Sequence, residues 1–173
     1  FSSKERTILI SIILPILNES KYIKQTLESI LNQNNINQVV EIIVTDGMST
    51  DGTREIIKTY SQNDERIHLI DNPEQIVSTG FNRALSIANG EIIIRVDGHS
   101  TIDRNFIKNC LSELTNTKAD CVGGATEHIA SGVIGHSINL AQSSIFGVGG
   151  VAFRLGVKEG QYVDTLAFGA YKR

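Results

Sequence analysis

The sequence predicts an α/β fold, with a Rossmann-like, mostly parallel sheet and helices on both of its faces. Two observations predict it. Apolar strand segments alternate four times with segments whose apolar residues recur every three or four positions, as on one face of a helix. The strand segments are also apolar almost throughout, which is typical of parallel strands that helices cover on both sides.

Two strand–helix units come first. The predicted strands cover residues 8–14 and 39–45. Ser20 is expected to cap the first helix. The polar loop DGMSTDGT leads into the second helix, and Asp51 is expected to be a turn or cap residue in this loop. The apolar residues that mark the two helices are Ile23, Leu27, Ile30 and Leu31 in the first, and Ile56, Ile57 and Tyr60 in the second.

Two further units and a last strand follow. The predicted strands cover residues 66–70, 91–96 and 119–124. The third helix is expected to end at Asn89-Gly90, with the glycine in the left-handed conformation, and Asp103 is expected to cap the fourth. The apolar residues that mark these helices are Val77, Phe81, Ala84, Leu85 and Ala88 in the third, and Phe106, Ile107, Cys110, Leu111 and Leu114 in the fourth.

Composition narrows the class of protein. The chain has 173 residues, 40% of them apolar and 20% charged, which suits one globular domain. A net charge of −3 argues against a nucleic-acid partner. Cys110 and Cys121 form no CxxC pair and are expected to be buried thiols, in keeping with a reducing cytoplasm. The apolar run TILISIILPIL is too short to span a bilayer.

Polar segments follow three of the predicted strands. Residues 15–19 follow the first, Asp46 follows the second, and Asp97 and His99 follow the fourth. Ligands of open parallel sheets bind outside the carboxyl ends of the strands. We therefore expect Glu19, Asp46, Asp97 and His99 to converge at one edge of the sheet.

The chemistry of this edge limits its ligand. The first strand-to-helix turn, PILNES, lacks the glycines that cradle a dinucleotide phosphate, and no GxxxxGK[ST] occurs. An acidic edge would bind a diphosphate through a divalent cation held by carboxylate and imidazole. Asp46 could instead accept hydrogen bonds from a base or a ribose. Each residue also has an ordinary alternative, as a turn former, a charge in the first turn of a helix or a surface histidine.

Three motifs together resemble family 2 glycosyltransferases, which have the GT-A fold. They are SIILPILNESKYIKQTLESIL, EIIVTDGMSTDGT and NGEIIIRVDGHS, in this order and at this spacing. The resemblance covers roughly residues 8–173. The segments RVDGHS, FGVGGVAFR and YVDTLAFGAYKR are similar to the bacterial exopolysaccharide branch, the succinoglycan-type transferases.

The resemblance implies roles for particular residues. Those expected to contact the donor nucleotide are Pro15, Glu19, Asp46, Asn82 and Asp97, with Asp46 on the base. Asp97 opens the DxD motif that binds the metal–diphosphate, and His99 replaces its usual second aspartate. Asp97 and His99 are therefore the expected metal ligands. The cation is Mn²⁺ or Mg²⁺, and the imidazole favours Mn²⁺.

The resemblance also implies an aspartate general base in an acidic motif some tens of residues past the YVDT segment. No such motif occurs between Gly123 and Arg173, where Glu159 and Asp164 are not promoted to this role. The catalytic base is expected beyond Arg173. We expect a single GT-A domain over residues 1–173, truncated at its C-terminus, with 1–122 as the nucleotide-sugar-binding half and 123–173 as the start of the acceptor half.

The function expected from this resemblance is inverting transfer of a sugar from a nucleotide-diphosphate donor, a UDP-sugar first of all. The acceptor is an oligosaccharide or a lipid-linked saccharide in polysaccharide biosynthesis. The expected location is the cytoplasm, at the inner face of the membrane in the full-length protein, with membrane association through regions outside this sequence. Two alternatives stay open: a nucleotidyltransferase, which should carry a basic glycine-rich loop, and a nucleotide-sugar-binding domain without transfer activity.

Overall fold

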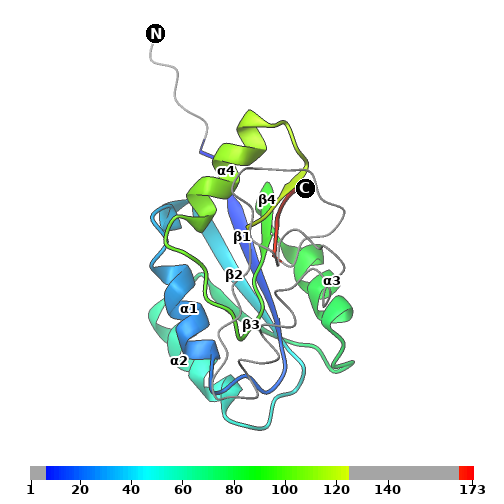
Figure 1. Cartoon of the computed structure of the whole chain (residues 1–173). Helices are drawn as coiled ribbons and strands as arrows, with labels where there is room; N and C mark the ends of the chain where they lie inside the picture. Colours follow the sequence, from blue (N-terminus) through cyan, green and yellow to red (C-terminus); the bar gives the residue numbers. More distant parts are fainter. Residues whose placement is uncertain (1–6, 125–167) are drawn as a thin grey trace, which may run out of the picture. The chain divides into compact units, whose positions relative to one another are not determined.

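A computed structural model describes residues 7–124 and 168–173. These residues contain one six-stranded sheet with the order β3-β2-β1-β4-β6-β5 (Figure 1). The strands are β1 (Ile10–Ile16), β2 (Val39–Asp46), β3 (Ile67–Asp71), β4 (Ile92–Arg95), β5 (Cys121–Val122) and β6 (Ala170–Lys172). The chain divides into two compact units, and the first, residues 1–122 with 170–173, holds all of these strands.

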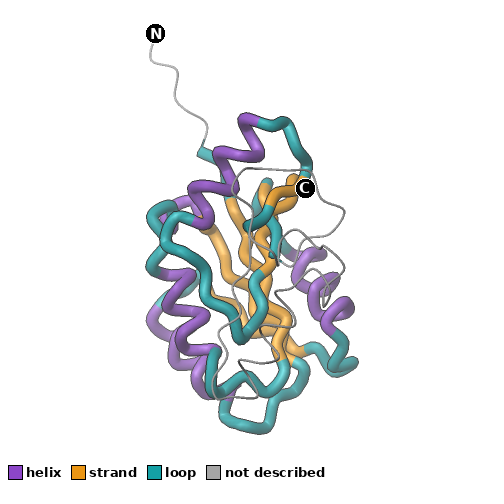
Figure 2. Tube along the Cα trace, viewed as in Figure 1, coloured by secondary structure: helices purple, strands orange, loops and turns teal. Residues whose placement is uncertain are grey.

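Helices cover both faces of the sheet, as predicted (Figure 2). Three pack on one face, where Ile12 and Leu14 of β1 point, and one packs on the other, where Ile13 points. The helices of the first face are α1 (Ile23–Leu31), α2 (Thr53–Asn63) and α4 (Phe106–Asn116), and that of the second is α3 (Val77–Ile87). The short 3-10 helix η1 (Ile36–Gln38) was not predicted.

The topology creates a switch point between β1 and β4. β1 pairs in parallel with β2 on one side and with β4 on the other, and β3 pairs in parallel with β2. Connections therefore leave the carboxyl ends of β1 and β4 in opposite directions, which is where open α/β sheets bind ligands. The last register pair of these two strands is Ile13↔Arg95, so they part beyond it.

β6 is the one strand of the described sheet that the sequence did not reveal. It lies antiparallel between β4 and β5, with Ile93 opposite Tyr171 and Cys121 opposite the same tyrosine. A three-residue strand is too short to carry a recognisable pattern. The strand expected at residues 119–124 is reduced to Cys121–Val122, which pairs only with β6.

Three predicted caps were wrong. The first turn of α1 is closed by the Glu19 carbonyl, which accepts hydrogen bonds from the N–H groups of Tyr22 and Ile23 at 2.9 Å, so Ser20 is not needed there. Gly90 has no left-handed φ; a Cβ on it would lie 2.3 Å from the backbone nitrogen of Ser11. Asp103 accepts from the N–H of Asn105 and closes a turn before α4 instead of capping it.

Both cysteines are free thiols, but only one is buried as predicted. Cys110 is buried in the core and Cys121 is half-buried. Burial raises the pKa of the Cys110 thiol to about 12, which keeps it protonated and unreactive.

Within residues 7–124 and 168–173, no helix has the length and apolar character needed to cross a bilayer.

A buried carboxylate joins the amino ends of β1 and β2 to the turn before β4. Ser11 donates its hydroxyl to Glu41 at 2.5 Å, the N–H and side-chain amide of Asn89 donate to the same carboxylate, and Gly90 donates its N–H to Ser11 at 2.7 Å. Burial raises the pKa of Glu41, but these hydrogen bonds outweigh that effect and hold it below its usual 4.5.

We expect Glu41→Gln to lower the free energy of unfolding by about 1.5–3 kcal/mol at neutral pH, because a hydrogen-bonded charge is lost. A lowered folded pKa stabilises the protein above the unfolded value of 4.5 and loses that effect as the pH falls through the folded pKa. The difference between the variant and the wild type should therefore shrink below pH 4.5. Urea unfolding at pH 7 and near pH 3.5 measures it, and an equal difference at both pH values would contradict the ionised role of Glu41.

Candidate functional site

The carboxyl ends of β1 and β4 bring two of the predicted residues into direct contact. His99 Nδ1 lies 2.8 Å from Glu19 Oε1, although the two residues are 80 positions apart. The Glu19 side chain is 18% exposed and that of His99 59%. A half-buried carboxylate thus holds an exposed imidazole at the edge of the sheet.

Gly98 makes this contact sterically feasible. A Cβ at this position would lie 2.7 Å from Ile16 Cγ2 and 3.0 Å from Glu19 Cγ. The Gly98 carbonyl also accepts the Thr26 hydroxyl of α1 at 2.9 Å. The turn after β4 is therefore pressed against the turn after β1, and a glycine is needed between Asp97 and His99.

Asp97 is held by a different partner. Arg95 directs both Nε and Nη2 at Asp97 Oδ1, each at 3.0 Å. The other carboxylate oxygen, Oδ2, has no hydrogen-bond partner among the residues that the structure describes. The Asp97 side chain is 25% exposed, and Oδ2 is its carboxylate oxygen that could accept a ligand.

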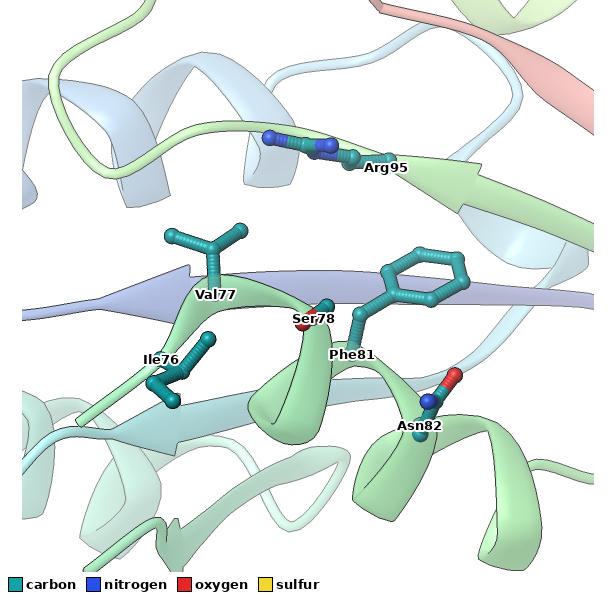
Figure 3. A pocket seen from close by; sticks show the side chains of 6 residues that line it. All are labelled: Ile76, Val77, Ser78, Phe81, Asn82 and Arg95. Carbon is teal, nitrogen blue, oxygen red and sulfur yellow. The ribbon is translucent and has the colours of Figure 1, made fainter. Parts of the chain in front are cut away.

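Arg95 also borders a pocket of about 510 Å³ on the α3 face of the sheet. Figure 3 shows Arg95 on β4 facing side chains from the start of α3, with Phe81 and Asn82 below it. The described residues that line the pocket are Ile76, Val77, Ser78, Phe81, Asn82 and Arg95. Asn82, predicted as a donor-binding residue, therefore lines the same pocket as Arg95, which holds Asp97.

Asp46 lies at the end of β2, as predicted, but is fully buried. Its carboxylate accepts hydrogen bonds from the Ser49 N–H at 3.0 Å, from the Ser49 hydroxyl, and from Arg54 Nη1 at 2.6 Å. Arg54 bonds Asp71 at 2.7 Å through Nη2, and its pKa is raised by Asp71 and then by Asp46. Through these hydrogen bonds, the buried Asp46 carboxylate holds the loop after β2 in place.

Sequence reasoning missed two arginines of the site, Arg95 at the end of β4 and Arg54. Arg54 occupies the first turn of α2, directly after the loop DGMSTDGT. Arg54 follows Asp46 by 8 positions, in the first turn of the next helix, and this spacing is the signal in the sequence that could have indicated it.

The loops after β1 and β2 are joined by hydrogen bonds. Asn18 donates its N–H to Ser49 at 2.8 Å and accepts from Thr50 at 2.9 Å, and Glu19 donates its N–H to Thr53 at 2.9 Å. Asn18 takes a left-handed φ of 54°, as asparagine tolerates. This pairing fixes the backbone on which the Glu19 side chain stands.

Asp51 has the turn role predicted for it. Its carboxylate accepts from the hydroxyl and N–H of Thr53 and from the N–H of Ser20. The hydrogen bond from the Thr53 hydroxyl is the main cause that holds the pKa of Asp51 well below its usual range.

Pro15 lies inside β1 instead of in the loop after it. It is buried and pairs with Thr45 of β2. Proline has no N–H to donate, and Pro15 stands beyond the last pair of β1 with β4. Pro15 therefore lies where β1 and β4 separate, at a position where β4 needs no hydrogen bond from it.

Asp97 and His99 offer a carboxylate and an imidazole, which are the kinds of ligand that hold a cation shared with a phosphate-bearing ligand. Within the described residues, no three His, Cys, Asp or Glu side chains are grouped to hold a metal ion. Asp97 Oδ2 and His99 Nε2 would supply two ligands. Divalent cations in phosphate-binding sites commonly take one or two protein ligands and complete their shell with phosphate oxygens and water. The residues present fit such a cation.

Two residues discussed for the catalytic base, Glu159 and Asp164, lie outside the described residues.

Comparison with known sequences identifies a family and a relative. Residues 11–140 match the profile of Glycosyl transferase family 2. The chain is 33% identical over 147 residues to the succinoglycan biosynthesis protein ExoA of Rhizobium meliloti (strain 1021). The aligned region covers 84% of this chain and 44% of that protein. The resemblance that the motifs indicated is thus confirmed.

Two solved structures share the fold. The structure of S. aureus TarS 1-349 in complex with UDP is 26% identical, with a TM-score of 0.62 over 73% of this chain and 38% of that one. The mannosyltransferase PcManGT from Pyrobaculum calidifontis, in complex with GDP-Man and Mn²⁺, is 23% identical, with a TM-score of 0.64 over 72% of this chain and 37% of that one. The chain therefore spans less than half the length of these three proteins.

Proposed function

The chain belongs to glycosyl transferase family 2, and we propose that it is the donor-binding part of an inverting glycosyltransferase in polysaccharide biosynthesis. The donor is a nucleotide-diphosphate sugar, a UDP-sugar first of all. The acceptor is an oligosaccharide or a lipid-linked saccharide. In this proposal residues 1–122 form the nucleotide-sugar-binding half and residues 123–173 begin the acceptor half.

One observation carries the proposal. Arg95 lines the same pocket as Asn82 and at the same time bonds the Asp97 carboxylate at 3.0 Å. The pocket and the acidic edge are therefore parts of one site, next to the switch point between β1 and β4. A nucleotide would lie along this edge, with its diphosphate at Asp97.

Asp97 and His99 would hold the divalent cation, Mn²⁺ in preference to Mg²⁺ because imidazole is the softer ligand. When bound, the cation neutralises the charge that develops on the leaving diphosphate. The Mn²⁺ in the PcManGT complex supports this choice. Arg95 keeps the Asp97 carboxylate in one orientation, and Asp46 with Arg54 supports the loop that faces the nucleotide.

Activation of the acceptor hydroxyl requires a general base, which we place beyond Arg173. Donors of this class are highly charged and do not cross a bilayer unaided, so we place the full-length protein in the cytoplasm, at the inner face of the membrane.

Titration calorimetry of residues 1–173 with UDP tests the proposal. We expect UDP to bind in the presence of Mn²⁺, more weakly with Mg²⁺, and most weakly without a cation, because Asp97 and His99 would hold a cation that offsets the charge of the diphosphate. UMP is the control ligand, since it lacks the second phosphate and should gain little from Mn²⁺. Absence of UDP binding under all three conditions would refute the donor site. Equal binding with both ions would count against His99 as a ligand.

A further inference from the structure

We propose that Glu19 is a positioning residue for His99: it holds the neutral imidazole in the tautomer that presents Nε2 to the cation of the donor complex. The proposal rests on the proposed function, because the cation belongs to the donor. The observation behind it is the contact of 2.8 Å between His99 Nδ1 and Glu19 Oε1.

The chemistry of the two groups sets the direction of this hydrogen bond. An ionised carboxylate can only accept, so Nδ1 must carry the proton. In a neutral imidazole the other nitrogen, Nε2, then keeps its lone pair and can bind a metal ion. Metal-binding histidines generally donate their second N–H to such a partner, which fixes the ring and its tautomer.

Glu19 is held firmly enough to act in this way. Its N–H bonds the Thr53 hydroxyl at 2.9 Å, and its carbonyl accepts from the first turn of α1. Gly98 packs against its side chain, where an added Cβ would lie 3.0 Å from Glu19 Cγ. The carboxylate is also the less exposed partner, at 18% against 59% for His99.

Asp97 shows the same arrangement with a different partner. Arg95 bonds one oxygen of Asp97 and leaves Oδ2 open, while Glu19 bonds one nitrogen of His99 and leaves Nε2 open. Two expected ligands, separated by Gly98, thus each have a dedicated neighbour and one available atom. An ordinary surface ion pair between Glu19 and His99 would add little stability and would give Nε2 no role.

The first experiment measures the tautomer directly. In ¹⁵N-labelled wild-type protein without nucleotide, above the pH at which His99 is protonated, we expect the ¹⁵N shifts of His99 to report a proton on Nδ1. In Glu19→Ala the acceptor for the Nδ1–H group is lost, and the proton should move mainly to Nε2. A wild-type His99 with its proton mainly on Nε2, or no change in the variant, overturns the proposal.

The second experiment measures affinity for UDP with Mn²⁺. Glu19→Gln should weaken binding by about tenfold, as for other residues that orient a metal ligand. Glu65→Gln, which removes the same charge from an exposed position before β3, should leave it unchanged. In a His99→Ala background, Glu19→Gln should have no further effect. An equal loss in both backgrounds would show that Glu19 acts without His99 and would overturn the proposal.

The outcomes separate this proposal from the proposed function. No UDP binding by the wild type and by Glu65→Gln would refute the donor site itself. Wild-type affinity in Glu19→Gln would refute only the positioning role. Circular dichroism of each variant confirms folding, which we expect because the backbone of Glu19 makes its contacts with Thr53 and α1.

Discussion

Asp97→Ala is expected to lower the affinity for UDP in the presence of Mn²⁺ by about 100-fold, with little change in stability. The carboxylate would provide the charged ligand of the cation, whose electrostatic contribution at a phosphoryl group is worth several kcal/mol. The Asp97 side chain is a quarter exposed, and among the described residues it bonds only Arg95, so the described part of the fold loses only a partly exposed ion pair. Calorimetry with UDP and thermal unfolding of the same samples measure the two effects.

Asp120→Ala is the matched control, because it removes the same charge from a side chain that is 95% exposed. Asp46→Ala gives the contrasting result. It should weaken UDP binding and also lower stability by about 3–5 kcal/mol, since it leaves Arg54 without its buried partner. Wild-type affinity in both Asp46→Ala and Asp97→Ala would refute a nucleotide site at this edge.

Sugar transfer by residues 1–173 is expected to be about 10²–10⁴-fold slower than transfer by a version extended past Arg173. The proposed donor-binding residues Pro15, Glu19, Asp46, Asn82 and Asp97 all precede residue 100, whereas we expect the general base beyond the last residue. General-base catalysis is worth about that factor in rate. Both proteins should bind UDP with similar affinity, because the donor half is common to them.

The assay uses one nucleotide-sugar donor and a panel of saccharide acceptors, with UDP affinity measured in parallel. The version extended past Arg173 and carrying Asp97→Ala serves as the control for donor-dependent turnover. Equal rates for the two lengths would place the base within residues 1–173 and would make Glu159 or Asp164 the candidate.

Local pattern was enough to predict the architecture. The apolar runs of β1, β2 and β4, and the helical stripes between them, predicted a parallel sheet with helices on both faces, which the structure confirms. The alternation of strands with helices and the helical periodicity are patterns of residues that are close in the sequence, so a single sequence is sufficient to detect them. The same order implied that Glu19, Asp97 and His99 follow strand ends, because parallel strands deliver their carboxyl ends to one edge.

Contacts between distant residues were decided by the tertiary structure alone. No pattern indicates that Glu19 bonds His99 80 residues away, that Arg54 joins Asp46 to Asp71, or that β6 enters the sheet antiparallel beside β4. These contacts depend on how loops dock once the core has formed. Their partners are polar side chains whose sequence context fits an exposed turn equally well. A hydrogen bond between them needs positions defined to a few tenths of an ångström, which only the packed sheet and helices provide.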